Sequence, residues 1–161
     1  MYDGPEWQRM ANRRLLVDRV LCVAWRTPEP DDLSTITTEL LAHKARLGRP
    51  LLYYSVIGIK GIPQGDVRDK LVAFYTALLA TCDSMHVVIE GSEFEQSIKR
   101  SVIANVLLHV QARGRIFIEN SLERVQLVSP PAIRPELVRA AQVATEARLW
   151  DFARADSAAR A

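Results

Sequence analysis

Short apolar segments rich in β-branched and aromatic residues alternate along this chain with longer segments whose apolar residues recur every three or four positions. The first kind of segment is typical of strands buried on both faces, and the second is typical of amphipathic helices. A helix between two consecutive strands favours a parallel pair joined by a right-handed crossover. The alternation therefore predicts an α/β fold built on a mostly parallel sheet.

The sequence predicts a mixed sheet of about five strands. One strand is expected within residues 7–16, where Arg13 and Arg14 favour an edge strand that faces water. Asp18 and Arg19 are expected to form the turn of a hairpin with the next strand. The remaining strands are expected at residues 20–25, 51–57, 85–89 and 115–119.

Helices are expected between these strands and after the last one. The clearest has a capping box at Ser92 and Glu95, and apolar residues recur at every fourth position from Phe94 to Val110. The other helices are expected at residues 32–47, 66–82, 121–128 and 135–153, followed by a tail at 156–161. The predicted order is β-β-α-β-α-β-α-β-α with an extra C-terminal helix, in a single domain over residues 1–161.

The composition excludes several classes of protein. The hydrophobic fraction of 48% and charged fraction of 25% are those of a globular domain with a core. Lys and Arg number 21 against 19 Asp and Glu, without the basic face of a nucleic-acid-binding protein, so no nucleic-acid partner is expected. The first residues do not resemble a secretory signal, and no apolar run approaches the roughly 20 residues that span a bilayer. We therefore expect a cytoplasmic protein without membrane insertion.

Residue patterns that support catalysis or hold a cofactor are missing from the sequence. His43, His86 and His109 have no metal-binding spacing, and His86 is interpreted as a core residue of a strand. There is no nucleophile elbow, no Walker loop and no dinucleotide-binding glycine motif after a strand. Cys22 and Cys82 lie in separate apolar segments, which favours two buried thiols. The sequence therefore predicts no enzyme, no metal and no cofactor.

Over residues 6–128 the element order resembles the STAS fold of anti-sigma-factor antagonists and the broader group of bacterial STAS-like domains. The resemblance rests on the opening hairpin, the helix at 32–47, the strand at 51–57, and a loop leading to a helix capped by Asp66. It implies a regulatory domain that binds a protein through this loop. In the family, a phosphorylatable Ser or Thr follows an Asp just before that helix. Residues 62–67 contain no hydroxyl group, so control by phosphorylation at this position is not expected.

The resemblance places the partner-binding site in the loop and in the first turn of the helix. The candidate residues are Ile62, Gln64, Gly65, Asp66 and Arg68. Ile62 is an apolar residue in a loop punctuated by glycine and proline, where an exposed side chain would indicate binding and a buried one would only anchor the loop. N-capping explains Asp66 without further assumptions. Arg68 stands in a first helical turn, where the helix dipole disfavours a cation, so we expect an acidic group on the partner.

Other functions stay open at this point. A second copy of the chain is an alternative partner, through a sheet edge or the last helix. A small-molecule or lipid-binding domain is the second hypothesis, because open α/β sheets bind ligands beyond the carboxyl ends of their strands. A ligand-sized cavity between the sheet and the helix at 66–82 would favour it. An enzyme would rest on analogy of fold alone.

Overall fold

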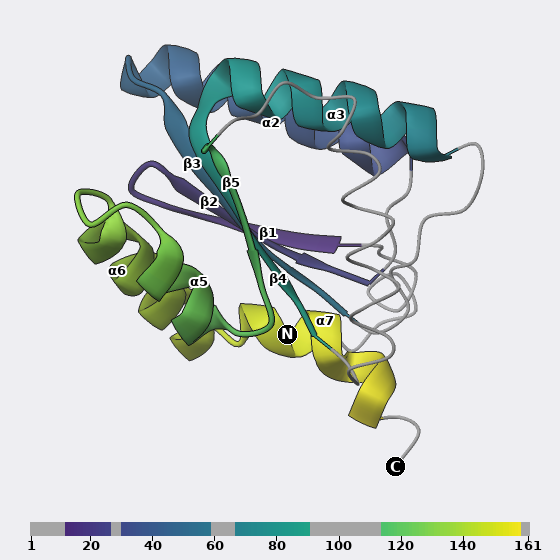
Figure 1. The fold of residues 1–161 in the computed structure, drawn as a ribbon. Coiled ribbons are helices and arrows are strands. Elements are labelled where there is room, and N and C mark those ends of the chain that lie inside the picture. Colours follow the sequence, from purple (N-terminus) through teal and green to yellow (C-terminus); the bar gives the residue numbers. More distant parts are fainter. Residues whose placement is uncertain (1–11, 27–29, 59–66, 91–113, 159–161) are drawn as a thin grey trace.

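The structure is a computed structural model that describes residues 12–26, 30–58, 67–90 and 114–158, with only the backbone described at 30–33, 67–68, 70–71 and 155–158 (Figure 1). A five-stranded mixed sheet lies at its centre, in the order β1-β2-β3-β4-β5. The strands are β1 (Asn12–Val17), β2 (Val20–Trp25), β3 (Leu51–Ile57), β4 (Cys82–Ile89) and β5 (Ile116–Glu119). Only β1 is antiparallel to its neighbour. The predicted α/β class and mostly parallel sheet are therefore confirmed.

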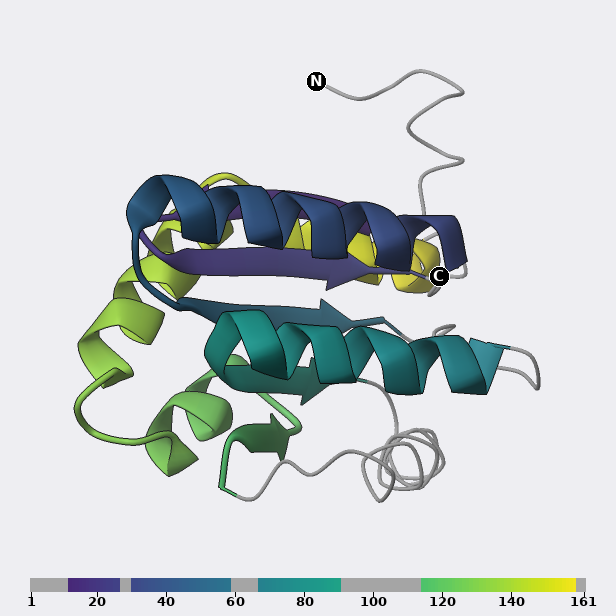
Figure 2. The same cartoon turned by 90° about the horizontal axis from the view of Figure 1, so that it is seen from above.

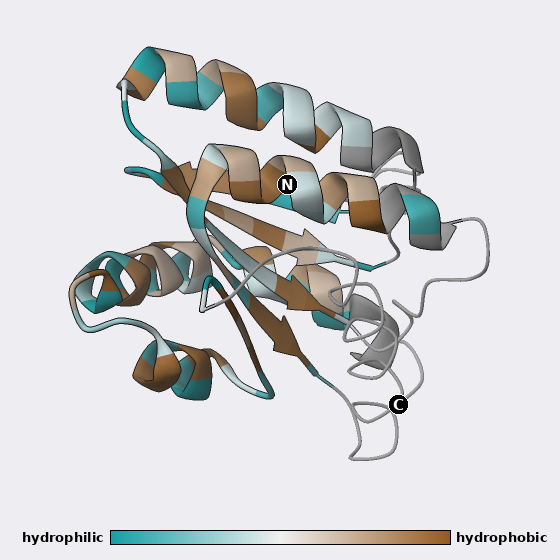
Figure 3. Ribbon diagram, turned by 45° about the horizontal axis from the view of Figure 1, so that its top comes forward, coloured by the Kyte–Doolittle hydropathy of each residue, from teal (hydrophilic) through white to brown (hydrophobic). Residues whose placement is uncertain are grey.

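Helices cover both faces of the sheet. On one face lie α2 (Pro30–Leu47) and α3 (Val67–Thr81), and on the other lie α5 (Leu122–Val128), α6 (Arg134–Glu146) and α7 (Leu149–Ala158) (Figures 1 and 2). Hydrophobic residues are concentrated along the strands between these layers (Figure 3). The helix expected from Phe94 to Val110 lies outside the described residues.

The hairpin at the start of the sheet has the expected turn. Asp18 and Arg19 join β1 to β2, and Asp18 has a φ of 53°. Aspartate adopts this left-handed conformation more readily than most residues. The backbone N–H of Leu52 donates to the carbonyl oxygen of Arg19 at 2.9 Å, so the turn is attached to the first residues of β3.

Each face of the sheet has its own core. Beneath α2 and α3, Phe74 packs edge-on against Trp25 and Tyr53, with ring centroids 6.3 and 6.2 Å apart. The Trp25 indole N–H donates to the Tyr53 hydroxyl oxygen at 2.9 Å. Beneath α5, α6 and α7, Trp150 packs against Tyr54, and their ring centroids are 5.7 Å apart. The two cores together bury both sides of the central strands.

The two free cysteines belong to different cores. Cys22 faces the α6 and α7 layer, whereas Cys82 belongs to the core beneath α2 and α3. Burial raises the pKa of each thiol to about 12. A disulfide between them would have to cross the sheet, so both are buried thiols, as the sequence predicted.

The C-terminal region differs from the single helix predicted at 135–153. It forms two helices, α6 and α7, separated at Ala147 and Arg148, and Arg148 has a φ of 59°. In one continuous helix, Arg148 would lie on the same face as the buried residues Leu137 and Ala144, and its cation would point at the sheet. The break leaves Arg148 exposed and buries Trp150 instead. The second helix continues to Ala158, into the predicted tail.

Candidate interaction surfaces

The predicted partner-binding residues fall mostly outside the described part of the chain. Ile62, Gln64, Gly65 and Asp66 lie in residues 59–66, and Arg68 stands in the first turn of α3 with its side chain undescribed. The structure places only the ends of the connection, after β3 and at the start of α3. Binding of a partner by these residues therefore stays a prediction.

The carboxyl ends of the parallel strands lie together at one end of the sheet, which we call the carboxyl edge. The connection after β3 leaves the sheet there. Gly58 N–H donates to the Trp25 carbonyl at 3.0 Å and Glu90 N–H to the Ile57 carbonyl at 3.3 Å, which extends the ladder past the strands. A Cβ atom at Gly58 would clash with the backbone carbonyl of Ala153 in α7. Close approach of α7 therefore requires glycine at this position.

Two arginines fasten α7 to the carboxyl edge. The Arg154 Nε donates to both carboxylate oxygens of Glu90, at 2.9 and 2.8 Å, and this hydrogen bonding raises the pKa of Arg154. The Arg26 guanidinium lies 3.9 Å from the centre of the Phe152 ring and donates to the Phe152 carbonyl at 3.1 Å. We call Arg26, Gly58, Glu90, Phe152 and Arg154 the carboxyl-edge cluster. It holds the point at which the connection after β3 begins.

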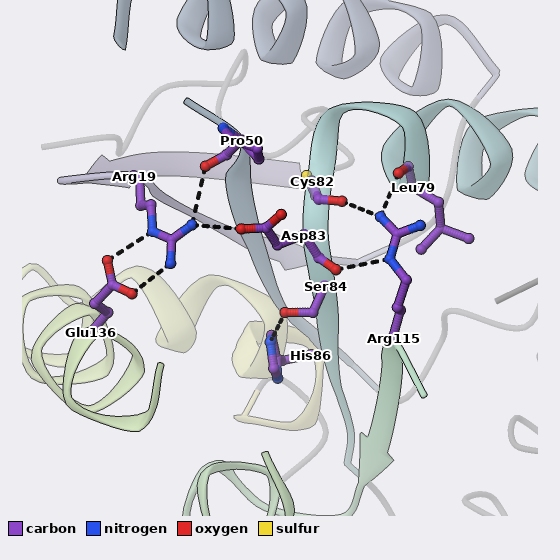
Figure 4. A network of polar contacts seen from close by, with 9 residues as sticks. All are labelled: Arg19, Pro50, Leu79, Cys82, Asp83, Ser84, His86, Arg115 and Glu136. Atoms are coloured by element: carbon purple, nitrogen blue, oxygen red, sulfur yellow. Dashed lines mark hydrogen bonds and ion pairs between the residues drawn. The ribbon is translucent and has the colours of Figure 1, made fainter. Parts of the chain in front are cut away.

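At the amino edge of the sheet, buried Arg19 joins several elements (Figure 4). Its guanidinium donates to both carboxylate oxygens of Glu136 at 2.8 Å, to Asp83 at 2.9 Å and to the Pro50 carbonyl at 3.3 Å. The hydrogen bond from Arg19 lowers the pKa of Glu136. Arg115 donates to the carbonyls of Leu79, Cys82 and Asp83. These contacts satisfy groups of the fold itself, so we interpret this edge as structural.

A buried hydrogen-bonded chain centres on His86. The Ser129 hydroxyl donates to the Val125 carbonyl, so its oxygen accepts from His86 Nδ1–H at 2.8 Å. His86 Nε2 then accepts from the Ser84 hydroxyl, also at 2.8 Å. Burial lowers the pKa of His86 to about 4, so the ring is neutral.

Ser84 and His86 form the hydrogen bond that a nucleophile and its base would form, but a substrate could not reach the serine. Ser84 is 5% exposed and His86 is 0% exposed, and the imidazole stacks on Phe117 with centroids 5.2 Å apart. A reacting group would have to open the core to reach the serine. The hydrogen bonds of His86 instead link Ser129, at the end of α5, to β4, as expected for a satisfied core histidine.

A groove of about 420 Å³ lies beside the edge strand β1 and α2. Its lining includes Asn12, Arg14, Leu16, Glu39 and His43. Arg14 donates to both carboxylate oxygens of Glu39 at 2.6 Å. The sequence predicted the edge strand but missed the groove, because no local pattern connects Arg14 with a residue of the following helix.

The space between the sheet and α3 bears on the small-molecule alternative. Among the described residues, Trp25, Tyr53, Phe74 and Tyr75 meet there, and all are buried. Phe74 and Tyr75 have ring centroids 5.6 Å apart. The groove beside β1 is a different place from the one that this alternative requires. These aromatic side chains fill the described part of that space, and the small-molecule alternative stays a prediction.

Comparisons with known proteins returned no match among family models, curated proteins or solved structures. Within the described ranges, no three His, Cys, Asp or Glu side chains gather in a way that would hold a metal ion. The helices described for this chain include none that is both long and apolar enough to cross a membrane.

Proposed function

We propose that this protein is a non-enzymatic regulatory module that binds another protein at the carboxyl edge of its sheet. The observation that carries the proposal is the end of the sheet at which the crossover connections leave the parallel strands. The crossover connections after β2, β3 and β4 all leave the sheet at the carboxyl edge. Described arginines join elements of the fold at both edges, so the proposal does not depend on them: Arg19 and Arg115 do so at the amino edge, and Arg26 and Arg154 at the carboxyl edge. Loops on a rigid sheet are common positions for binding residues.

The partner surface in this proposal is the connection after β3 with the first turn of α3. Gly58 precedes it directly, and the carboxyl-edge cluster fixes Gly58 against α7. A fixed starting point lowers the entropy that the connection loses when it binds. The STAS-like element order supports the same surface, without a phosphorylation switch at residues 62–67. We expect this activity in the cytoplasm, with a homodimer as the alternative assembly.

The test compares two double variants of the full chain. Ile62→Ser with Arg68→Ala changes the proposed surface. Leu41→Ser with Arg139→Ala is the matched control, because Leu41 is 56% exposed on α2 and Arg139 forms only an exposed ion pair with Asp18 among its described contacts. Each protein is used to capture proteins from lysate of the source cells, and its melting temperature is measured.

We expect the loop variant to lose a captured protein that the wild type and the control both retain. The control should melt close to the wild type, because Leu41 and Arg139 are exposed and exposed substitutions change stability by about 0.5 kcal/mol or less. The melting temperature of the loop variant shows whether that variant is folded. Equal capture by a folded loop variant would contradict the proposal.

A further inference from the structure

Four cations surround the C-terminal ends of α2 and α3, which lie side by side (Figures 1 and 2). They are Lys44, Arg46, Arg49 and Arg115, which we call the helix-end cluster. Gly48, with a φ of 68°, ends α2 by donating its N–H to the Lys44 carbonyl at 2.9 Å. The chain turns there, and it exposes Arg46 before the turn and Arg49 after it.

Two members of the cluster contact the end of α3, whose last turn has no basic residue of its own. The Lys44 ammonium donates to the Ala80 carbonyl at 3.2 Å. The Arg115 guanidinium donates to the Leu79 carbonyl at 2.6 Å and to the Cys82 carbonyl at 2.5 Å (Figure 4). These cations complement the negative end of the helix dipole. Lys44 and Arg115 therefore lie together at one helix end and stabilise it.

The other two members have guanidinium groups that the fold hardly uses. Among the described residues, no ion pair joins any of the four cations to a carboxylate. Arg46 shares a hydrogen bond with His43 Nδ1 at 3.2 Å, and Arg49 donates none in the described part of the chain. Most N–H donors of Arg46 and Arg49 are therefore available to a partner.

The surroundings of the cluster leave an excess of positive charge. The dipoles of two helix ends together carry about one negative charge. Beside them, Arg19 meets the carboxylates of Asp83 and Glu136, which leaves one more negative charge. The pKa of Glu136 is lowered by the hydrogen bond from Arg19 and also by the charge of Arg49, so this carboxylate is ionised and acts on the cluster. Against four cations, roughly two positive charges stay uncompensated.

Charge and chemistry indicate which partner fits. Three of the four cations are arginines, whose planar guanidinium binds a carboxylate through two parallel hydrogen bonds. Leu47 lies between Arg46 and Arg49 in the sequence and is 38% exposed, so an apolar contact is offered beside the charges. A protein segment with acidic and apolar side chains is complementary to both features.

Other occupants fit this surface less well. Segments that bind anionic lipids carry about four to eight clustered basic residues, whereas about two charges stay uncompensated here. Tight binding to nucleic acid likewise needs many phosphate contacts. In a symmetric dimer through this surface, two copies of the cluster would face each other, and like charges repel.

We propose that the helix-end cluster binds an acidic segment of a partner protein. Carboxylates of this segment accept hydrogen bonds from Arg46 and Arg49, and an apolar side chain of the segment packs on Leu47. The surface shares no residue with the carboxyl-edge cluster or with residues 62–68. Its failure would therefore leave the proposed function standing, and the reverse also holds.

The probe is a displayed library of short random peptides, selected on the full chain at about 50 mM salt, where exposed charges are weakly screened. We expect enrichment of peptides with paired Asp or Glu residues beside an apolar residue. The best peptide is synthesised with a fluorophore, and its binding is measured by anisotropy. Its affinity should fall steeply at about 500 mM salt. A copy with Asn and Gln in place of Asp and Glu should not bind, and this measurement does not depend on the folding of any variant.

Arg46→Gln with Arg49→Gln removes the two exposed charges of the cluster. We expect this variant to bind the peptide at least about tenfold more weakly, because charge-assisted hydrogen bonds are lost. Arg124→Gln with Arg148→Gln is the matched control, because it removes the same net charge from two exposed arginines that already pair with carboxylates of this chain. The control should bind the peptide as the wild type does.

The variant of the other proposed surface, Ile62→Ser with Arg68→Ala, should also bind this peptide as the wild type does. The melting temperature of each protein shows that it is folded. If this variant lost the peptide while folded, the peptide would occupy the connection after β3 and not the helix-end cluster.

Four further results would overturn the proposal. One is a selection without acidic enrichment. Another is equal binding of the peptide by the wild type and the folded cluster variant. The third is cluster-dependent binding that is tighter for a random-sequence DNA duplex or for vesicles containing phosphatidylserine than for the peptide, because the occupant would then be another polyanion. The last is a dimer of the free chain that the cluster variant fails to form, because the second copy would then be the occupant.

Discussion

Replacing Gly58 with alanine tests whether α7 is seated on the carboxyl edge of the sheet. Two effects oppose each other. Alanine restricts the unfolded chain and stabilises a protein by about 0.4–1 kcal/mol wherever its backbone conformation is allowed. At Gly58, φ lies outside the left-handed region, so the backbone itself accepts alanine. The new Cβ, however, meets the backbone carbonyl of Ala153, which cannot rotate away as a side chain would.

The clash should prevail over the entropy gain. Forcing an extra carbon into a packed site costs typically about 1–3 kcal/mol. Displacing α7 would also strain the contacts of Arg26 with Phe152 and of Arg154 with Glu90. With the entropy gain subtracted and the strained contacts included, we expect a net loss of about 1–2.5 kcal/mol, or roughly 2–10 °C in melting temperature for a chain of this size.

Urea unfolding followed by circular dichroism measures this loss, and hydrogen exchange shows whether α7 amides become less protected. If Gly58→Ala is as stable as the wild type or more stable, α7 does not lie against Gly58 and the carboxyl-edge cluster is wrongly described. Unchanged exchange in α7 with a destabilised sheet would indicate that the strain is absorbed elsewhere.

Three further predictions concern groups inside the fold. Arg19→Gln should lower the free energy of unfolding by about 1–3 kcal/mol, because it removes the partner of Glu136. Glu136→Gln should destabilise the Arg19→Gln protein less than it destabilises the wild type, which a double-mutant cycle in urea would measure. The pKa of His86 is lowered from 6.5 to about 4, so between these pH values the unfolded chain binds more protons than the folded one. The free energy of unfolding should therefore fall by up to about 3 kcal/mol as the pH drops from 6.5 towards 4. His86→Leu should be less stable, but its free energy of unfolding should depend less steeply on pH. Cys22 and Cys82, whose pKa values are raised to about 12, should react with iodoacetamide at pH 8 only in urea, and labelling of the native protein would show that these thiols are accessible.

The sheet could be predicted from the sequence because its signals are local. Continuous apolar segments indicated the buried strands, and Arg13 with Arg14 indicated the edge strand. The break between α6 and α7 has no local signal, because the segment around Ala147 and Arg148 contains neither glycine nor proline. It depends on tertiary packing of Trp150 against Tyr54. The partner-binding residues proposed from the STAS-like order stay predictions, since residues 59–66 lie outside the described part of the chain.

Neither the groove nor the contact of α7 with Gly58 could be predicted from the sequence, and the physical reason is the same for both. Each depends on two residues that are distant in sequence and meet only after folding. Arg14 meets Glu39 across the edge of the sheet, and Gly58 meets Ala153 across its end. Neither pair has a periodicity or a spacing that would mark it before the layers are assembled.

The contact of α7 with the carboxyl edge follows from the topology of the sheet. The strands lie in sequence order, and α2 and α3 both cover the same face. The chain after β5 therefore has the opposite face to cover, and α5, α6 and α7 pack there. Glu136 at the start of α6 is fixed to Arg19 at the amino edge, so the chain runs from that edge back to the carboxyl edge, where Arg154 meets Glu90. Because α7 also packs on β1 and β2, the last helix contacts both the carboxyl edge and the edge strand.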